Sequence, residues 1–111
     1  MFKVITIGDV PVEMKATGST VIRYKQIFHR DYFRDINDSD IADRIDVFTR
    51  MGFVMAKQAE GADMGKLNED SFIDWLDQFD PLDVESATDQ IMLFFAGSEK
   101  QSVNPKKETE A

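Results

Sequence analysis

The sequence predicts an α+β fold that is mainly α-helical, with an N-terminal β-hairpin packed on a small bundle of about four helices. Two patterns predict it. β-Branched, aromatic and alternating apolar residues fill the first sixteen positions, and apolar residues then recur at helical spacing to about residue 96. The length of 111 residues fits one domain, and 42% hydrophobic residues can fill a core. We therefore expect a single globular domain over residues 1–97 and a disordered, flexible tail over 98–111.

The hairpin is predicted over residues 2–16. Its first strand reads FKVITI, and the pair Gly8-Asp9 follows as a turn signal before a second alternating stretch. Pro11 cannot donate a ladder hydrogen bond, so the second strand is expected to be an edge strand or to begin just after Pro11. Because an isolated hairpin is marginal in water, it must pack on the helices.

Four helices are expected from apolar stripes at three- and four-residue spacing, over residues 19–36, 40–60, 69–79 and 81–96. Hydroxyl groups just before residue 21 and Asn68 offer N-terminal caps, while Gly61 and Asp80-Pro81 end two of the helices. Gly52 lies inside the second helix, where it costs about 1 kcal/mol relative to Ala. That cost indicates close approach by a neighbouring element.

The charge of the chain bears on its partners. It has 21 acidic and 13 basic residues, a formal net charge of -8 and a pI near 4.5. Nucleic acid and anionic lipid are repelled by such a surface, and no apolar run approaches the ~20 residues that span a bilayer. The first residues also lack the apolar stretch of a signal peptide. We expect no nucleic acid partner, no membrane association and a cytoplasmic location.

The chain contains few residues that could perform catalysis. The chain has no cysteine and one histidine, so it cannot build a His-Cys triad or a two-histidine metal site on its own. His29-Arg30-Asp31 copies the core of a kinase catalytic loop, but the glycine-rich loop and the Asp-Phe-Gly motif are missing. We expect His29 to lie on a helix surface or at a helix end, and we expect no enzyme activity and no cofactor.

A cluster of oxygen-bearing side chains could bind a calcium ion. Its members are Asp35, Asn37, Asp38, Asp40 and Asp46. An EF-hand loop that began at Asp35 would need a glycine where Asp40 stands and a bidentate Glu where the shorter Asp46 stands. Helix capping therefore explains these residues better than a metal site.

Five acids between Glu69 and Asp80 alternate with apolar residues and include no base between them. If they converged in a cleft, paired carboxylates could perform glycoside hydrolysis. On an amphipathic helix, such acids are more often a solvated face opposite a core face. The sequence thus favours binding over catalysis for this segment.

Apolar residues of the last two predicted helices are candidates for contact with a protein partner, because aromatic side chains dominate interface hot spots. The candidates are Phe72, Trp75, Leu76, Phe79, Ile91, Phe94 and Phe95. Core packing is the alternative for each, since a domain of this size needs its aromatic residues inside. The same stripes could also mediate self-association.

Three stretches, in this order, resemble the tail assembly chaperone family of siphophages and related prophages. They are Val12 to Thr17 (VEMKAT), Ile22 to Asp31 (IRYKQIFHRD) and Asp74 to Asp80 (DWLDQFD). Phe53 to Ala59 also fits the central helix of the family, so the likeness covers residues 2 to about 96. Order and spacing carry the resemblance, and His29 departs from it by standing where a glycine is expected.

The resemblance implies a non-enzymatic protein of the host bacterial cytoplasm that is absent from the mature virion. Such a protein binds the tape measure protein, with the tail tube protein as a further partner, before tube subunits polymerise. An acidic domain with aromatic stripes can offer grooves to amphipathic helices. The family often makes a longer product by translational frameshifting, for which Lys106-Lys107 could provide a slippery adenine tract. A structural tail or virion component and a small acidic protein-interaction module are the alternatives.

Overall fold

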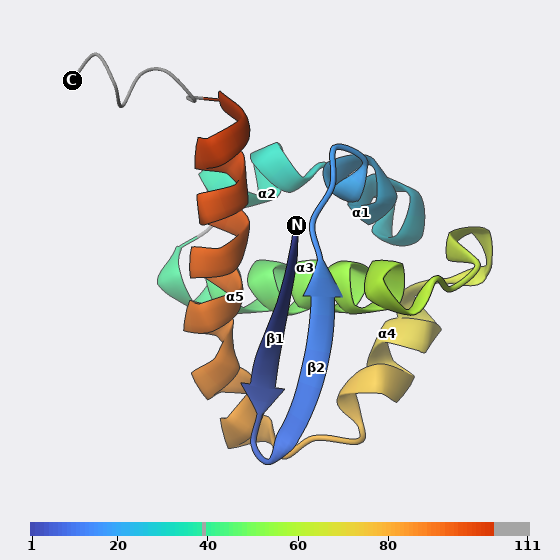
Figure 1. Cartoon of the computed structure of the whole chain (residues 1–111), viewed down its shortest axis with the longest axis vertical. Helices are drawn as coiled ribbons and strands as arrows, with labels where there is room; N and C mark the ends of the chain where they lie inside the picture. The colour runs from blue at the N-terminus through green and yellow to red at the C-terminus, as the bar shows by residue number, and fades with distance from the viewer. Residues whose placement is uncertain (39, 104–111) are drawn as a thin grey trace.

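A β-hairpin lies across one side of a long central helix, and the remaining helices surround that helix (Figure 1). This computed structural model describes the backbone of residues 1–38 and 40–103 and, except at 41, 42 and 98–103, their side chains. The elements are β1 (Phe2–Ile7), β2 (Val10–Lys15), α1 (Thr20–Phe28), α2 (Tyr32–Asp38), α3 (Ile41–Glu60), a 3₁₀ turn (Met64–Lys66), α4 (Glu69–Leu76) and α5 (Pro81–Val103). The predicted α+β, mainly α-helical class is confirmed.

The hairpin turns at Gly8, whose φ of 64° is open to glycine at little cost. At the end of the hairpin opposite the turn, Met1 and Ala16 exchange two backbone hydrogen bonds, of 2.8 and 3.0 Å. Because bonded and non-bonded pairs alternate in an antiparallel ladder, the opposed residues Thr6 and Pro11 form a non-bonded pair. The missing N–H of Pro11 is therefore tolerated inside β2, which is an edge strand as predicted.

The middle of α3 is buried around its whole circumference. From Met51 to Ala56, every residue is buried, and β2, α1, α2, α4 and α5 all pack on this helix. A Cβ on Gly52 would lie 2.8 Å from Cδ1 of Ile91 in α5 and 3.5 Å from Cε of Met14 in β2. The predicted close approach of a neighbour at Gly52 is confirmed, and α5 is that neighbour.

The predicted helix over residues 19–36 is wrong in one respect, because the structure divides it into α1 and α2. His29 ends α1 in the left-handed conformation with a φ of 57°, and its N–H donates to the carbonyl of Lys25. Asp31 then starts α2 by accepting hydrogen bonds from two backbone N–H groups. The apolar spacing hides this break, because Tyr24 and Tyr32 face the same core with ring centroids 5.8 Å apart.

A polar clamp fixes the angle between α1 and α2. Asp35 accepts a hydrogen bond of 2.8 Å from the Tyr24 hydroxyl and one of 2.9 Å from Nε of Arg30. Burial, and then the bond to Asp35, raises the pKa of Tyr24 well above its usual range. Asp35 therefore holds the two short helices together.

Helix ends follow the predicted caps in most places. Asp40 and Asn68 accept hydrogen bonds from the third residues of α3 and α4, and Gly61 ends α3 with a φ of 73°. At α1 the predicted hydroxyl cap is modified: the Ser19 side chain makes no capping bond, and Thr20 accepts one from the N–H of Thr17. The capping interpretation is confirmed for Asp40.

Two predicted boundaries are corrected. Helix α4 ends at Leu76 rather than at residue 79, because the chain turns there with the N–H of Phe79 donating to the carbonyl of Leu76. Helix α5 continues to Val103, so residues 98–103 are helical rather than part of the tail. The rest of the predicted tail, including Lys106-Lys107, lies outside the described residues. Along the described part of the chain, no helix has both the length and the apolarity needed to cross a membrane.

The strain at His29 leads to a stability prediction. Replacing His29 with glycine removes the steric cost of the left-handed conformation, and the exposed imidazole contributes little packing. We expect His29→Gly to raise the free energy of unfolding by about 0.5 to 1 kcal/mol, measured by urea denaturation. The control Gln26→Gly, within α1, should lower it by about 1 kcal/mol. Equal destabilisation by both substitutions would contradict the assignment of strain.

The contact between Gly52 and Ile91 predicts non-additive substitutions. Gly52→Ala should destabilise the protein by about 1 kcal/mol, because overpacking against Ile91 exceeds the gain in helix propensity. In an Ile91→Val background, which lacks Cδ1, the same change should be neutral or stabilising. A double-mutant cycle measures this coupling, and additive effects within about 0.3 kcal/mol would show that the two residues do not interact.

Candidate functional site

The seven candidate contact residues divide by burial. Phe72, Ile91 and Phe95 are 2, 2 and 4% exposed and belong to the core. A partner cannot reach them in this fold, so their assignment to partner binding is corrected, with core packing as their role. Phe94 and Trp75 are also buried, at 8 and 6% exposed, but each lies in the wall of a surface hollow.

The remaining candidates gather at the end of α4. Leu76 and Phe79 are partly exposed, and the ring of Phe79 lies 5.2 Å from that of Trp75 in an edge-on arrangement. Trp75 in turn contacts Phe53 of α3, with centroids 5.6 Å apart. The end of α4 therefore offers an apolar wall whose inner side is fixed by the core.

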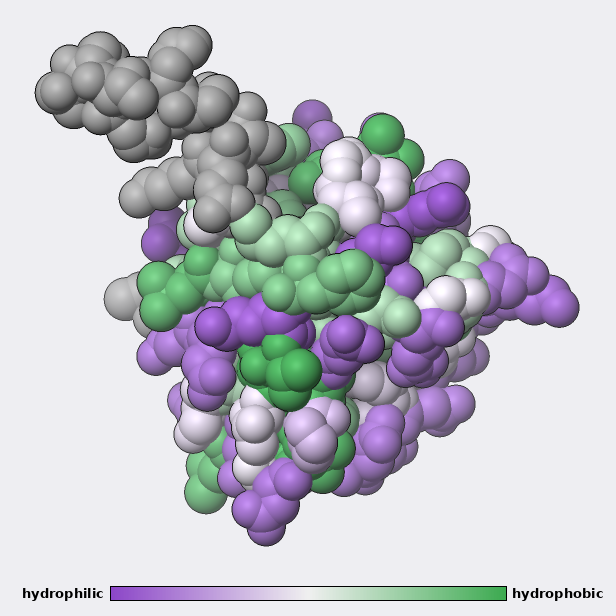
Figure 2. All heavy atoms as spheres, viewed as in Figure 1, coloured by the Kyte–Doolittle hydropathy of each residue, from purple (hydrophilic) through white to green (hydrophobic). Residues whose placement is uncertain are grey.

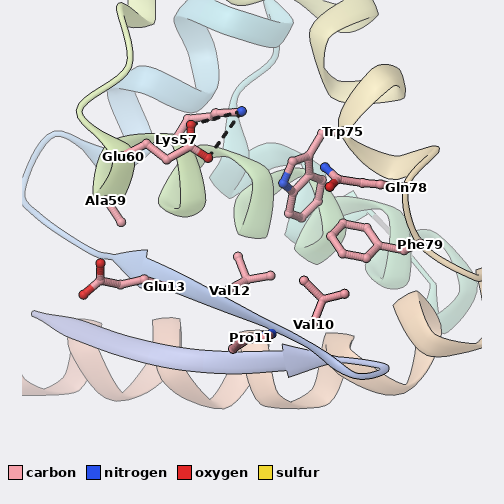
Figure 3. A pocket seen from close by; sticks show the side chains of 10 residues that line it. All are labelled: Val10, Pro11, Val12, Glu13, Lys57, Ala59, Glu60, Trp75, Gln78 and Phe79. Carbon is pink, nitrogen blue, oxygen red and sulfur yellow. Dashed lines mark hydrogen bonds and ion pairs between the residues drawn. The ribbon is translucent and has the colours of Figure 1, made fainter.

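This wall faces β2 across a hollow of about 270 Å³, which we call the β2–α4 groove (Figure 3). Val10 and Val12 of β2 point toward Phe79 and Trp75, while Lys57 lies on α3 at the far end. The lining residues are Val10, Pro11, Val12, Glu13, Lys57, Ala59, Glu60, Trp75, Gln78 and Phe79. The groove thus has an apolar centre and charged residues at one end.

The edge of β2 that faces away from β1 is open. The alternation fixed by the Met1 and Ala16 bonds places Glu13 and Lys15 in non-bonded pairs, so their N–H and C=O groups point outward, as does the carbonyl of Pro11. Within the part of the chain that the structure describes, none of these groups bonds to another element. The opposite edge differs, because β1 packs beside α5.

Arg50 anchors the start of α4 to α3. Its guanidinium lies 4.8 Å from the ring centroid of Phe28 and 4.9 Å from that of Phe72, and it donates to Glu69 at 2.6 Å and to Asp46 at 3.3 Å. The hydrogen bond from Arg50 lowers the pKa of the Glu69 carboxyl. Arg50 therefore fixes the first turn of the helix whose other end forms the groove wall.

The charge of the protein is unevenly distributed. The first 66 residues contain ten acids and ten bases, whereas residues 67–97 contain eight acids and no base. The acids of the second segment are Glu69, Asp70, Asp74, Asp77, Asp80, Asp83, Glu85 and Asp89. All are exposed except Asp83, which is partly so. Helices α4 and α5 therefore give one part of the surface a strongly negative potential.

The structure shows where the acids considered for calcium binding and for glycoside hydrolysis lie. Of the calcium candidates, Asp35 is bonded to Tyr24 and Arg30, and Asp40 caps α3. Of the acids considered for glycoside hydrolysis, Glu69 is bonded to Arg50, and the other four are exposed rather than gathered in the β2–α4 groove. These carboxylates therefore serve as caps, clamps and surface charge.

A second exposed apolar surface lies over β1 and the adjoining turns of α5, and we call it the β1–α5 patch (Figure 2). Phe2, Val4 and Leu93 are 57, 55 and 67% exposed there. Next to them, a hollow of about 270 Å³ is lined by Met1, Lys3, Gln90, Leu93, Phe94 and Gly97. Sequence reasoning missed this surface, although FKVITI places apolar residues on both faces of β1. It predicted an edge strand after Pro11 but not the groove that borders that edge.

Searches against protein-family models, curated proteins and solved structures found no match to this chain. The observations that bear on function are therefore the geometry of the β2–α4 groove and the resemblance of the sequence motifs.

The Arg50–Glu69 pair predicts a dependence of stability on pH. Since the folded-state pKa of Glu69 is lowered, its contribution is present at neutral pH and is lost as the pH falls through that pKa. Glu69→Gln should lower the free energy of unfolding at pH 7 by no more than about 1 kcal/mol, because the Glu69 side chain is half exposed and its charge is screened by solvent. The deficit should shrink toward pH 2 to 3 in urea titrations. Asp74→Asn, which removes an unpaired exposed acid, is the control; an equal pH dependence in both would contradict the role of Arg50.

Proposed function

We propose that this chain is a tail assembly chaperone of the bacteriophage type, which binds the tape measure protein in the host cytoplasm and is absent from the mature virion. The β2–α4 groove is the observation that carries the proposal. It combines an apolar centre, an open strand edge and an acidic border, as a surface for a protein partner requires.

Two of the three motifs that carry the resemblance, and the central-helix stretch, meet at this groove, whereas Ile22 to Asp31 does not line it. VEMKAT begins at Val12 and supplies part of β2, and DWLDQFD supplies Trp75, Gln78 and Phe79. The stretch Phe53 to Ala59 supplies Lys57 and Ala59 of α3. Segments far apart in sequence thus form one surface, which supports a shared binding role for them.

The proposed activity involves no catalysis. Trp75 and Phe79 would cover an apolar segment of the tape measure protein, and so protect it from aggregation until tail tube subunits replace the chaperone. The acidic surface of α4 and α5 would keep loaded complexes apart by mutual repulsion. The β1–α5 patch is the candidate for a second contact, either with the tail tube protein or with another copy of this chain.

Co-expression with the tape measure protein tests the proposal. We expect the wild-type chain to keep the tape measure protein soluble and to co-purify with it. Phe79→Ser removes an aromatic side chain from the groove and should weaken the complex at least about tenfold in a pull-down titration. Ile73→Ser changes an exposed apolar residue of α4 that does not line the groove, and it should bind as the wild type does.

Two outcomes would contradict the proposal. One is a tape measure protein that stays insoluble and does not co-purify although the wild-type chain is folded. The other is a stoichiometric amount of this chain in purified virions, which would favour the alternative of a structural tail component. Thermal unfolding of Phe79→Ser and Ile73→Ser verifies that both variants are folded.

A further inference from the structure

The open edge of β2 has the hydrogen-bonding groups that a further strand requires. The N–H and C=O of Glu13 and Lys15, with the carbonyl of Pro11, all point away from β1. A hairpin has two edges, and α5 lies beside the other one. The free edge therefore borders the β2–α4 groove rather than another element of the described structure.

The groove gives an added strand room and side-chain contacts. A strand pairs at about 4.8 Å from its neighbour, and alternate side chains point to opposite faces. Those on the inner face would enter the hollow between Val12, Trp75 and Phe79, where apolar groups are favoured. Those on the outer face would lie in solvent near exposed charges.

The charges near the groove favour basic residues on that outer face. Glu13 and Glu60 line the groove, and its one cationic side chain, Lys57, is already paired with Glu60 at 3.3 Å. On the α4 side of the groove, the exposed acids Asp77 and Asp80 lie two residues before and one residue after Phe79 in the chain. A segment that alternates Lys or Arg with apolar residues complements both the groove and its border.

We infer that the β2–α4 groove binds its partner by strand addition: an extended segment with alternating basic and apolar residues pairs with the free edge of β2. The inference rests on the proposed function, because it specifies how the same groove holds its partner. A docked helix satisfies its own backbone bonds, so it would cover the outward groups of Glu13 and Lys15 without pairing them. An extended strand pairs these groups, which is why we favour it over a helix.

Trp75 provides a direct readout, because it is the only tryptophan of the chain and lies in the groove. The probe is a synthetic peptide of alternating Lys and Val, titrated while the fluorescence of Trp75 is followed. We expect a saturable change that weakens several-fold when NaCl is raised from about 0.05 to 0.5 M. A matched peptide of alternating Glu and Val should produce no change.

Two proline variants test the strand edge. Glu13→Pro removes an N–H that points outward and leaves the bonds to β1 in place, so it should weaken peptide binding at least about tenfold. Val4→Pro is the matched control, because Val4 is opposite Glu13 and its N–H points toward the other edge. It should bind the peptide within about twofold of wild type. Glu13→Ala measures the contribution of the carboxylate alone.

A change in the peptide keeps the test independent of how the variants fold. N-methylation of every second residue removes either the donors that would face β2 or those that would face solvent. Strand addition predicts that one methylated peptide loses binding and the other retains it. Equal binding of both, or binding of the peptide as a helix by circular dichroism, would overturn the inference.

The outcome can be separated from that of the proposed function. If the tape measure protein co-purifies equally well with wild type and with folded Glu13→Pro, strand addition is wrong and the chaperone proposal stands. If the basic peptide binds as expected but the tape measure protein does not, the chaperone proposal is wrong and strand addition at the groove stands.

Discussion

The burial of α3 from Met51 to Ala56 is the constraint on which the rest of the structure depends. A helix that is apolar around its whole circumference must be covered on every side, and the hairpin and four helices provide that cover. Gly52 lets α5 approach closely enough to close one side. β2 and α4 each pack on α3, and the β2–α4 groove is the space that this arrangement leaves between them.

Arg50 places a charge at the border of this core. Its side chain is only 12% exposed, and its guanidinium lies near two aromatic rings with Glu69 and Asp46 as its acceptors. The pairing offsets the cost of desolvation, and the rings belong to α1 and α4, so one side chain connects three helices. Because the start of α4 is fixed in this way, Trp75 at its other end has a defined position in the groove.

The local features could be predicted because they depend on residues that are close in sequence. The Gly8 turn, the Asn68 cap and the end of α3 at Gly61 are examples. The break at His29 was not predicted, because the apolar spacing continues through it, although the glycine that the resemblance expects at this position points to a left-handed residue there. Nor could periodicity separate Phe72, which is core, from Phe79, which lines the groove. The groove itself is formed by distant segments, so only their packing reveals it.

An open strand edge is normally a liability, because it can pair with the same edge of another copy. In the register centred on Glu13, the charges of β2 oppose that pairing. If two copies paired antiparallel about Glu13, the two Glu13 side chains would lie directly opposite each other, and like charges at that position are destabilising. The net charge of -8 adds repulsion between whole molecules. In the proposed strand addition, the same charges would attract a basic strand, so this register disfavours a second copy and favours a partner of opposite charge.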